Sequence, residues 1–269
     1  PIEVLKVLKN VSKHCYLLES LASSDSWGRY TFLGYEPGLE ITCVDGRVRI
    51  TDNGQVTQQN TRHPGEILRR IVAEHKSPKI EGFPTFTGGL VGYFSYDFIK
   101  YAEPNLKLDA EDQEHFNDFD LMLFDKVICF DNLKQKIILI ANASTDDLDS
   151  SYPAAVQALD EMAQLIRTGT PAPDQPLKLR SEFRHLFNKE QYCSMVERAR
   201  KYIYEGDIFQ VVLSNRLDAD CEGSLLDTYR LLRVINPSPY MFYFSSDDIE
   251  IAGASPETLV KLTDGTLYT

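Results

Sequence analysis

The chain has 269 residues, with 28 Lys or Arg against 40 Asp or Glu, and its formal net charge is −12. Its hydrophobic fraction of 43% and charged fraction of 25% are ordinary for a globular protein that buries a substantial core. The acidic balance repels phosphates and disfavours a nucleic-acid-binding protein. A membrane protein and a secretory signal are also disfavoured, because the sequence has no run of about 18 apolar residues and no apolar stretch behind a basic N-terminus.

The cysteines indicate a reducing compartment. They are odd in number and widely spaced, at Cys15, Cys43, Cys129, Cys193 and Cys221. None forms a C-x-x-C pair, and no histidine lies beside one at the spacing of a metal site. We therefore expect free thiols in a cytoplasmic protein, and neither a disulfide framework nor a zinc site.

The first third of the sequence is typical of β-strands joined by tight turns. Tyr30–Leu33 and Leu39–Val44 are short strand candidates. Asp45-Gly46 and Asn53-Gly54 are strong hairpin signals on either side of Arg47–Ile50.

A helix is predicted from Pro64 to about Lys76, since proline is favoured at the first helical position and apolar residues recur on one face. The glycine- and aromatic-rich segment Phe83–Tyr101 follows. It lacks the lysine and the serine or threonine of a phosphate-binding loop. We expect a buried strand whose glycines let another backbone approach.

The middle of the chain combines an acidic loop with regular elements. Leu106–Asp120 carries six acidic residues and is predicted to be a solvated loop. Leu121–Phe130 and Lys136–Ala141 are predicted to form a hairpin, and Tyr152–Gly169 an amphipathic helix. Residues 168–180 contain three prolines and little apolar content, which predicts an exposed connector.

The last third is more strongly periodic. Asn188 and Gln191 have the spacing of a capping box at the start of a helix that ends at Gly206. A strand, a helix and two strands are then predicted, in the order Asp207–Leu217, Ser224–Ile235, Tyr240–Phe244 and Ile249–Ala252. These elements predict an α+β fold of layered antiparallel sheets flanked by helices, with the two portions of the chain sharing one core.

Four separated stretches resemble a known family. They are Leu17-Leu18-Glu19-Ser20, Gly206–Ser214, Asn236–Tyr243 and Gly253–Glu257. Together they resemble the large subunit (component I) of anthranilate synthase, the chorismate-using enzyme that commits carbon to tryptophan. The resemblance implies that the fold is incomplete at its C-terminal end and that the chain divides into an N-terminal regulatory region (1–167), the connector (168–180) and the first part of a chorismate-binding domain (181–269).

The same resemblance implies a pocket for the feedback inhibitor L-tryptophan. Its contacts would be Ser20, Pro239, Tyr240 and Met241, with Leu18 and Glu19 adjoining them in the motif. The residue types suit this ligand: Glu19 can accept from an ammonium group, Ser20 can donate or accept, and a proline-rich corner with a thioether can pack on an indole ring. Composition alone favours a simpler interpretation, in which Leu17-Leu18 is a core strand and the prolines form a simple turn.

The resemblance also implies a reaction, in which ammonia adds to chorismate and pyruvate is eliminated to leave anthranilate. Mg²⁺ would anchor the substrate, and a glutamine amidotransferase subunit (component II) would supply ammonia. In this family the catalytic groups and the Mg²⁺ ligands lie beyond the position of Thr269. We therefore expect no catalytic or metal-binding residue here, give Glu257 no catalytic role, and predict that these 269 residues alone make no anthranilate.

Two alternatives stay open at this point. The large subunit of aminodeoxychorismate synthase, in the folate pathway, shares the fold and the starting substrate. The chain could also be an inactive module that binds tryptophan and docks a subunit.

Overall fold

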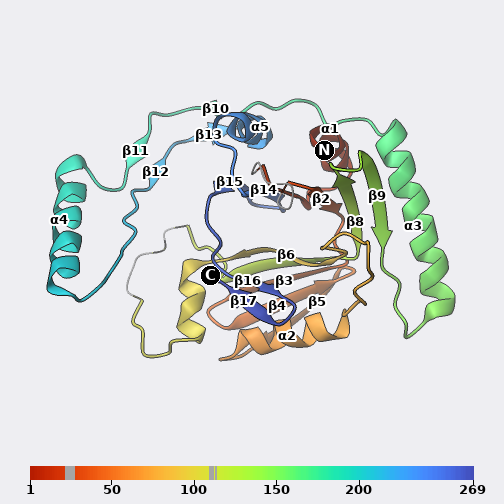
Figure 1. Ribbon diagram of the computed structural model, residues 1–269, viewed down its shortest axis with the longest axis horizontal. Coiled ribbons are helices and arrows are strands. Elements are labelled where there is room, and N and C mark those ends of the chain that lie inside the picture. The colour runs from red at the N-terminus through yellow and green to blue at the C-terminus, as the bar shows by residue number, and fades with distance from the viewer. Residues whose placement is uncertain (22–27, 109–111, 113) are drawn as a thin grey trace. The chain divides into compact units, whose positions relative to one another are not determined.

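The computed structural model describes residues 1–21, 28–108, 112 and 114–269 (Figure 1). Contacts divide the chain into two compact units. The first combines Pro1–Asp174 with Tyr229–Thr269, and the second is Gln175–Thr228. Both ends of the chain therefore belong to the first unit.

A six-stranded antiparallel sheet places the N-terminal strand at its centre, in the order β15-β14-β1-β2-β8-β9. Its strands are β1 (Cys15–Glu19), β2 (Tyr30–Tyr35), β8 (Lys126–Asp131), β9 (Lys136–Ala141), β14 (Tyr240–Ser245) and β15 (Glu250–Ser255). The predicted strands near residues 30, 240 and 250 are confirmed. The core-strand interpretation of Leu17-Leu18 is confirmed as well, because both lie in β1.

The second sheet of this unit has five antiparallel strands in the order β5-β4-β3-β7-β6. They are β3 (Leu39–Val44), β4 (Arg47–Asp52), β5 (Gln55–Asn60), β6 (Gly89–Phe94) and β7 (Phe119–Phe124). Both predicted hairpin turns are confirmed, with φ of +48° and +75° at Asp45 and Gly46, and +46° and +82° at Asn53 and Gly54. Positive φ at both central residues is the geometry that Asp-Gly and Asn-Gly favour.

The prediction of one strand over Leu121–Phe130 is wrong. The segment belongs to two strands, β7 and β8, which lie in different sheets and meet at Asp125. Both strands are largely buried, so the apolar run continues through the change of sheet and gives no sign of it.

The glycine-rich segment contains β6, and the prediction of a buried strand is wrong, because β6 is a half-buried edge strand. Among the described residues it pairs with β7 alone. A Cβ atom on Gly92 would lie 1.9 Å from the carbonyl oxygen of Asp120 in that neighbouring strand. The prediction that these glycines permit close approach of another backbone is confirmed at this position.

Helices cover the sheets. The first unit holds α1 (Ile2–Val11), α2 (Pro64–Glu74), α3 (Leu148–Thr168), the short 3₁₀ helix η1 (Tyr96–Tyr101) and most of α5 (Leu226–Ile235). Ile67, Leu68 and Ile71 of α2 pack on one face of the five-stranded sheet (Figure 1). The other face packs on the six-stranded sheet through Tyr16, Met122, Phe124 and Phe244. α1 was not predicted, and α3 starts one turn earlier than predicted.

The second unit is built around α4 (Lys189–Glu205). Its predicted capping box is confirmed by reciprocal hydrogen bonds between Asn188 and Gln191, and Gly206 ends the helix at φ +83°. Four two-residue strands pair as β10 with β13 and β11 with β12: β10 (Lys178–Leu179), β11 (Arg184–His185), β12 (Leu217–Asp218) and β13 (Cys221–Glu222).

The predicted strand over Asp207–Leu217 is wrong, because only Leu217 is in a strand. The apolar side chains of this segment find no pairing strand in the described part of the chain, and Phe209 is fully exposed. A last hairpin, β16 (Lys261–Thr263) and β17 (Thr266–Tyr268), belongs to the first unit. No helix among the described residues is long and apolar enough to cross a membrane.

Candidate functional site

The two stretches that suggested a pocket become neighbouring strands of the six-stranded sheet. β1 and β14 are antiparallel, with Glu19 opposite Met241 and Leu18 opposite Phe242. Just past the strand ends, the N–H of Leu21 donates to the carbonyl of Ser238 at 3.0 Å. Residues from the two ends of the chain are therefore held side by side by the main-chain ladder.

An open cleft of about 1020 Å³ lies where these strands end. Five of the six predicted site residues line it: Leu18, Glu19, Ser20, Pro239 and Tyr240. Aromatic and aliphatic side chains complete the wall, among them Tyr30, Phe32, Ile80, Phe83, Pro84 and Leu133. A mostly apolar cavity with a few polar groups is the usual form of a small-molecule site, although this one is at the large end of the range of roughly 300–1,000 Å³.

The cleft contains an unsatisfied hydroxyl and several cations. The Oγ of Ser20 is buried and has no hydrogen-bond partner among the described residues. Such groups are rare in proteins unless a ligand or water satisfies them. Arg29, Lys79 and Lys261 also line the cleft, so a carboxylate could be held there in spite of the acidic net charge of the chain.

Two of these polar side chains are fixed by neighbours. Arg29 donates to both carboxylate oxygens of Asp131, at 3.3 and 3.0 Å. This hydrogen-bonded cation lowers the pKa of Asp131 to about 2. The hydroxyl of Tyr240 lies 2.5 Å from that of Thr258, which orients the ring at the edge of the cleft.

Met241 is placed differently from its neighbour Tyr240. Side chains alternate along a strand, so Met241 points to the opposite face of the sheet. Its side chain is 1% exposed, and it is not among the residues that line the cleft. The structure therefore brings only the main chain of Met241 near the other predicted residues.

Glu19 is among the residues that line the cleft, but its side chain is only 2% exposed and its carboxylate is held by α5. One carboxylate oxygen accepts from the hydroxyl of Tyr229 at 2.6 Å and from Nε of Arg233, and the other accepts from Nη2 of Arg233 at 2.9 Å. Burial, and then the charge of Glu19, raise the pKa of Tyr229, so that phenol remains a donor. Both carboxylate oxygens are thus engaged by α5.

Tyr229 and Arg233 were missed in the sequence. They are four residues apart on α5 and lie on one helix face, where a tyrosine and an arginine can bind the same acid. The spacing was visible, but the acid that they bind is near the other end of the chain, so no local pattern indicated the contact.

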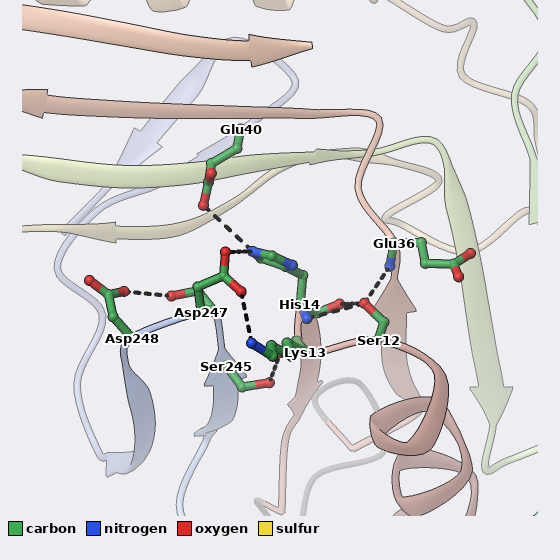
Figure 2. Close-up of polar contacts among 9 residues, drawn as sticks. Ser12, Lys13, His14, Glu36, Glu40, Ser245, Asp247 and Asp248 are labelled. Carbon is green, nitrogen blue, oxygen red and sulfur yellow. Dashed lines mark hydrogen bonds and ion pairs between the residues drawn. The ribbon is translucent and has the colours of Figure 1, made fainter. Parts of the chain in front are cut away.

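A second cluster of ionisable groups lies between the two sheets, away from this cleft. Figure 2 shows the ring of His14 between Glu40 of β3 and Asp247 of the β14–β15 turn, with Nε2 at 3.7 and 3.8 Å from their carboxylates. Lys13 pairs with Asp247 at 3.5 Å, and Ser245 donates to the carbonyl of Lys13 at 2.7 Å (Figure 2). These contacts tie the end of β14 to the start of β1.

Within residues 1–21, 28–108, 112 and 114–269, no three His, Cys, Asp or Glu side chains are grouped so that they could hold a metal ion. Glu257 is exposed, and its carbonyl accepts a hydrogen bond from the hydroxyl of Ser255. No catalytic step is assigned to this chain's residues.

Comparison with known proteins places this geometry in a family. Residues 15–269 match the family described as chorismate binding enzyme. Anthranilate synthase component 1 of Acinetobacter calcoaceticus is 36% identical over 277 residues, which cover 98% of this chain and 55% of that protein. The protein of the same name from Acetivibrio thermocellus is 35% identical, with 100% and 56% covered.

A solved structure agrees with the sequence comparison. The crystal structure of anthranilate synthase component I from Streptococcus pneumoniae TIGR4 matches with a TM-score of 0.73 and 31% identity, over 93% of this chain and 55% of that one. The predicted α+β fold and the predicted resemblance are confirmed, and the chain spans about half the length of the curated relatives it matches. This chain belongs to the family of chorismate binding enzymes.

Proposed function

We propose that this chain works as part of the large component of anthranilate synthase, and that the cleft between the ends of β1 and β14 binds L-tryptophan as a feedback inhibitor. The observation that carries the proposal is the pairing of the two motif stretches, which places Leu18 and Ser20 beside Pro239 and Tyr240 on one apolar cleft. The relatives named anthranilate synthase component 1 support the assignment.

The cleft offers what a free aromatic amino acid requires. Leu18, Phe32 and Tyr240 supply a wall for a ring, and the unpartnered hydroxyl of Ser20 can bond a polar group of the ligand. Lys79 and Lys261 bring positive charge to the same wall, where they can attract the carboxylate. Met241 belongs to the site through the strand that it fixes and not through a side chain in the cleft, whereas Glu19 lines the cleft with its carboxylate bound by α5.

The proposed reaction of the whole enzyme is the conversion of chorismate and ammonia into anthranilate and pyruvate, a lyase reaction. Ammonia would come from a glutamine amidotransferase component, and Mg²⁺ would bind the substrate carboxylate. The described residues do not provide a metal site, so we place neither the Mg²⁺ ligands nor the catalytic groups on them. We accordingly propose that residues 1–269 bind the inhibitor but do not turn over chorismate.

Isothermal titration of the 269-residue chain with L-tryptophan tests the proposal. We expect saturable one-to-one binding of L-tryptophan, weaker binding of L-phenylalanine, and loss of binding in Ser20→Phe, because a phenyl ring would fill the cleft. Ser194→Phe is the matched control, since Ser194 is an exposed residue of α4 and does not line the cleft.

Two results would count against this function. Equal affinity of the parent and Ser20→Phe for tryptophan would remove the site, and absence of binding at millimolar ligand would remove the inhibitor assignment. In a parallel assay of anthranilate fluorescence with chorismate, ammonium and Mg²⁺, turnover by the isolated chain would contradict the proposed placement of the catalytic groups.

A further inference from the structure

Both carboxylate oxygens of Glu19 are engaged by α5. Its side chain is 2% exposed, and its two oxygens accept three hydrogen bonds from two residues of α5. Arg233 approaches with both Nε and Nη2, which is the bidentate arrangement that fixes orientation as well as charge.

The donors are themselves held in place. Tyr229 is fully buried, and its ring lies 6.0 Å from that of Tyr243 in β14. The side chain of Arg233 is 26% exposed, and hydrogen bonding to Glu19 raises its pKa. One face of α5, with the buried phenol of Tyr229 and the partly buried guanidinium of Arg233, therefore holds Glu19, the last residue of β1.

Ser20 follows Glu19 directly, so whatever fixes Glu19 also fixes the start of the cleft wall. Alternation along the strand turns Glu19 toward α5, whereas Leu18 turns toward the other sheet and the cleft. The Oγ of Ser20 is buried at this wall without a partner among the described residues. Its position depends on a strand end that is fixed from the opposite face of the sheet.

We propose that Arg233, together with Tyr229, is a positioning residue of the ligand cleft. It holds the Glu19 carboxylate on the far face of the sheet and so sets the place of Ser20 on the near face. Glu19 then acts as a support, and the ammonium group of an amino acid in the cleft is bound by other groups. This inference rests on the proposed tryptophan site and assigns a role to two residues outside its lining.

The test is a double-mutant cycle read with two ligands. Glu19→Gln, Arg233→Gln and the double variant are titrated with L-tryptophan and with indole-3-propionate, which lacks the ammonium group. Arg230→Gln, on the exposed side of the same helix, is the control. Thermal unfolding of each variant without ligand confirms that the titrated protein is folded.

A supporting role predicts three linked results. Each single variant lowers the affinity for both ligands by the same factor, about five- to twentyfold. The double variant binds both ligands no more weakly than the worse single variant does, because both substitutions remove the same interaction between Glu19 and Arg233. Arg233→Lys, which keeps the charge and loses the bidentate contact, is intermediate for both ligands. The ratio of the two affinities separates a supporting role from direct binding of the ammonium group by Glu19. Partial unfolding also weakens the binding of both ligands alike, so the thermal unfolding measurement separates it from a supporting role.

A different pattern would overturn the inference. If Glu19 received the ligand ammonium, Glu19→Gln would weaken tryptophan tenfold or more and leave indole-3-propionate unchanged, while Arg233→Gln would leave tryptophan binding equal or tighter. If Arg233→Gln does not fold, Arg233→Lys is titrated in its place, and the ratio of its affinities for tryptophan and indole-3-propionate decides between the two roles. These outcomes presuppose that the parent binds tryptophan and that Ser20→Phe does not, so failure of the proposed function is recognised separately, in the parent and in Ser20→Phe.

Discussion

Glu19 and Met241 lie directly opposite each other in neighbouring antiparallel strands, although one is near the start of the chain and the other near its end. Both residues are buried, and of the two only Glu19 is among the residues that line the cleft. The residues next to them, Ser20 and Tyr240, line the cleft. A single register thus decides which residues of both motifs can touch a ligand and which can only support it.

This register predicts opposite phenotypes for two adjacent residues. Tyr240→Ala should weaken tryptophan binding by about tenfold or more, because it removes part of the cleft wall, and each lost ~1.4 kcal/mol of contact is tenfold in affinity. Met241→Ala should change affinity much less but lower the free energy of unfolding by about 2–5 kcal/mol, since a buried methionine leaves a cavity. Calorimetric titration and urea unfolding of both variants measure the two effects. If Met241→Ala mainly weakened tryptophan binding and Tyr240→Ala mainly lowered the free energy of unfolding, the register would be wrong.

The approach of β6 to β7 gives a second test. Gly92→Ala should lower the free energy of unfolding by more than about 2 kcal/mol, because its Cβ would meet a main-chain carbonyl that cannot move independently. Gly65→Ala is the matched control. No atom would contact a Cβ at Gly65 in the first turn of α2, and alanine there should stabilise by up to about 1 kcal/mol. Equal effects of the two substitutions would contradict the close contact between β6 and β7.

Much of this fold could be predicted from the sequence where the signal is local. The turns at Gly46 and Gly54, the proline at the start of α2 and the capping box of α4 depend on residues within a few positions of one another. Each was placed correctly for that reason.

What the sequence did not reveal depends on distant partners. The change of sheet at Asp125 is invisible because both flanking strands are buried. Residues 207–216 have the composition of a strand but no pairing strand within the described chain. For the cleft, the sequence motifs indicated which two stretches lie together. The face of the sheet on which each side chain lies followed only from the register of the strands.

The buried carboxyl group of Asp120 predicts that the free energy of unfolding depends on pH. Asp120 is 2% exposed, and its Oδ1 has no hydrogen-bond partner among the described residues. Burial, and then the charges of Glu40 and Asp248, raise the pKa of Asp120 to about 7. The unfolded chain ionises near pH 4, so the contribution of Asp120 to stability is largest below that pH and is lost as the pH rises toward 7.

Asp120→Asn mimics the protonated acid and should remove this loss. We expect it to raise the free energy of unfolding relative to the parent by roughly 2–3 kcal/mol more at pH 8 than at pH 5. Urea unfolding at both pH values is the measurement, with the exposed Asp125→Asn as control. An equal difference from the parent at the two pH values would contradict the raised pKa.

The central claim is that the ends of β1 and β14 form one cleft for an indole amino acid, and a crystal structure of the chain grown with saturating L-tryptophan tests it most directly. The account predicts the indole ring against Leu18 and Tyr240, with a polar group of the ligand within hydrogen-bond distance of Ser20 Oγ. Tryptophan bound on another surface of the chain, with this cleft left empty, would contradict it.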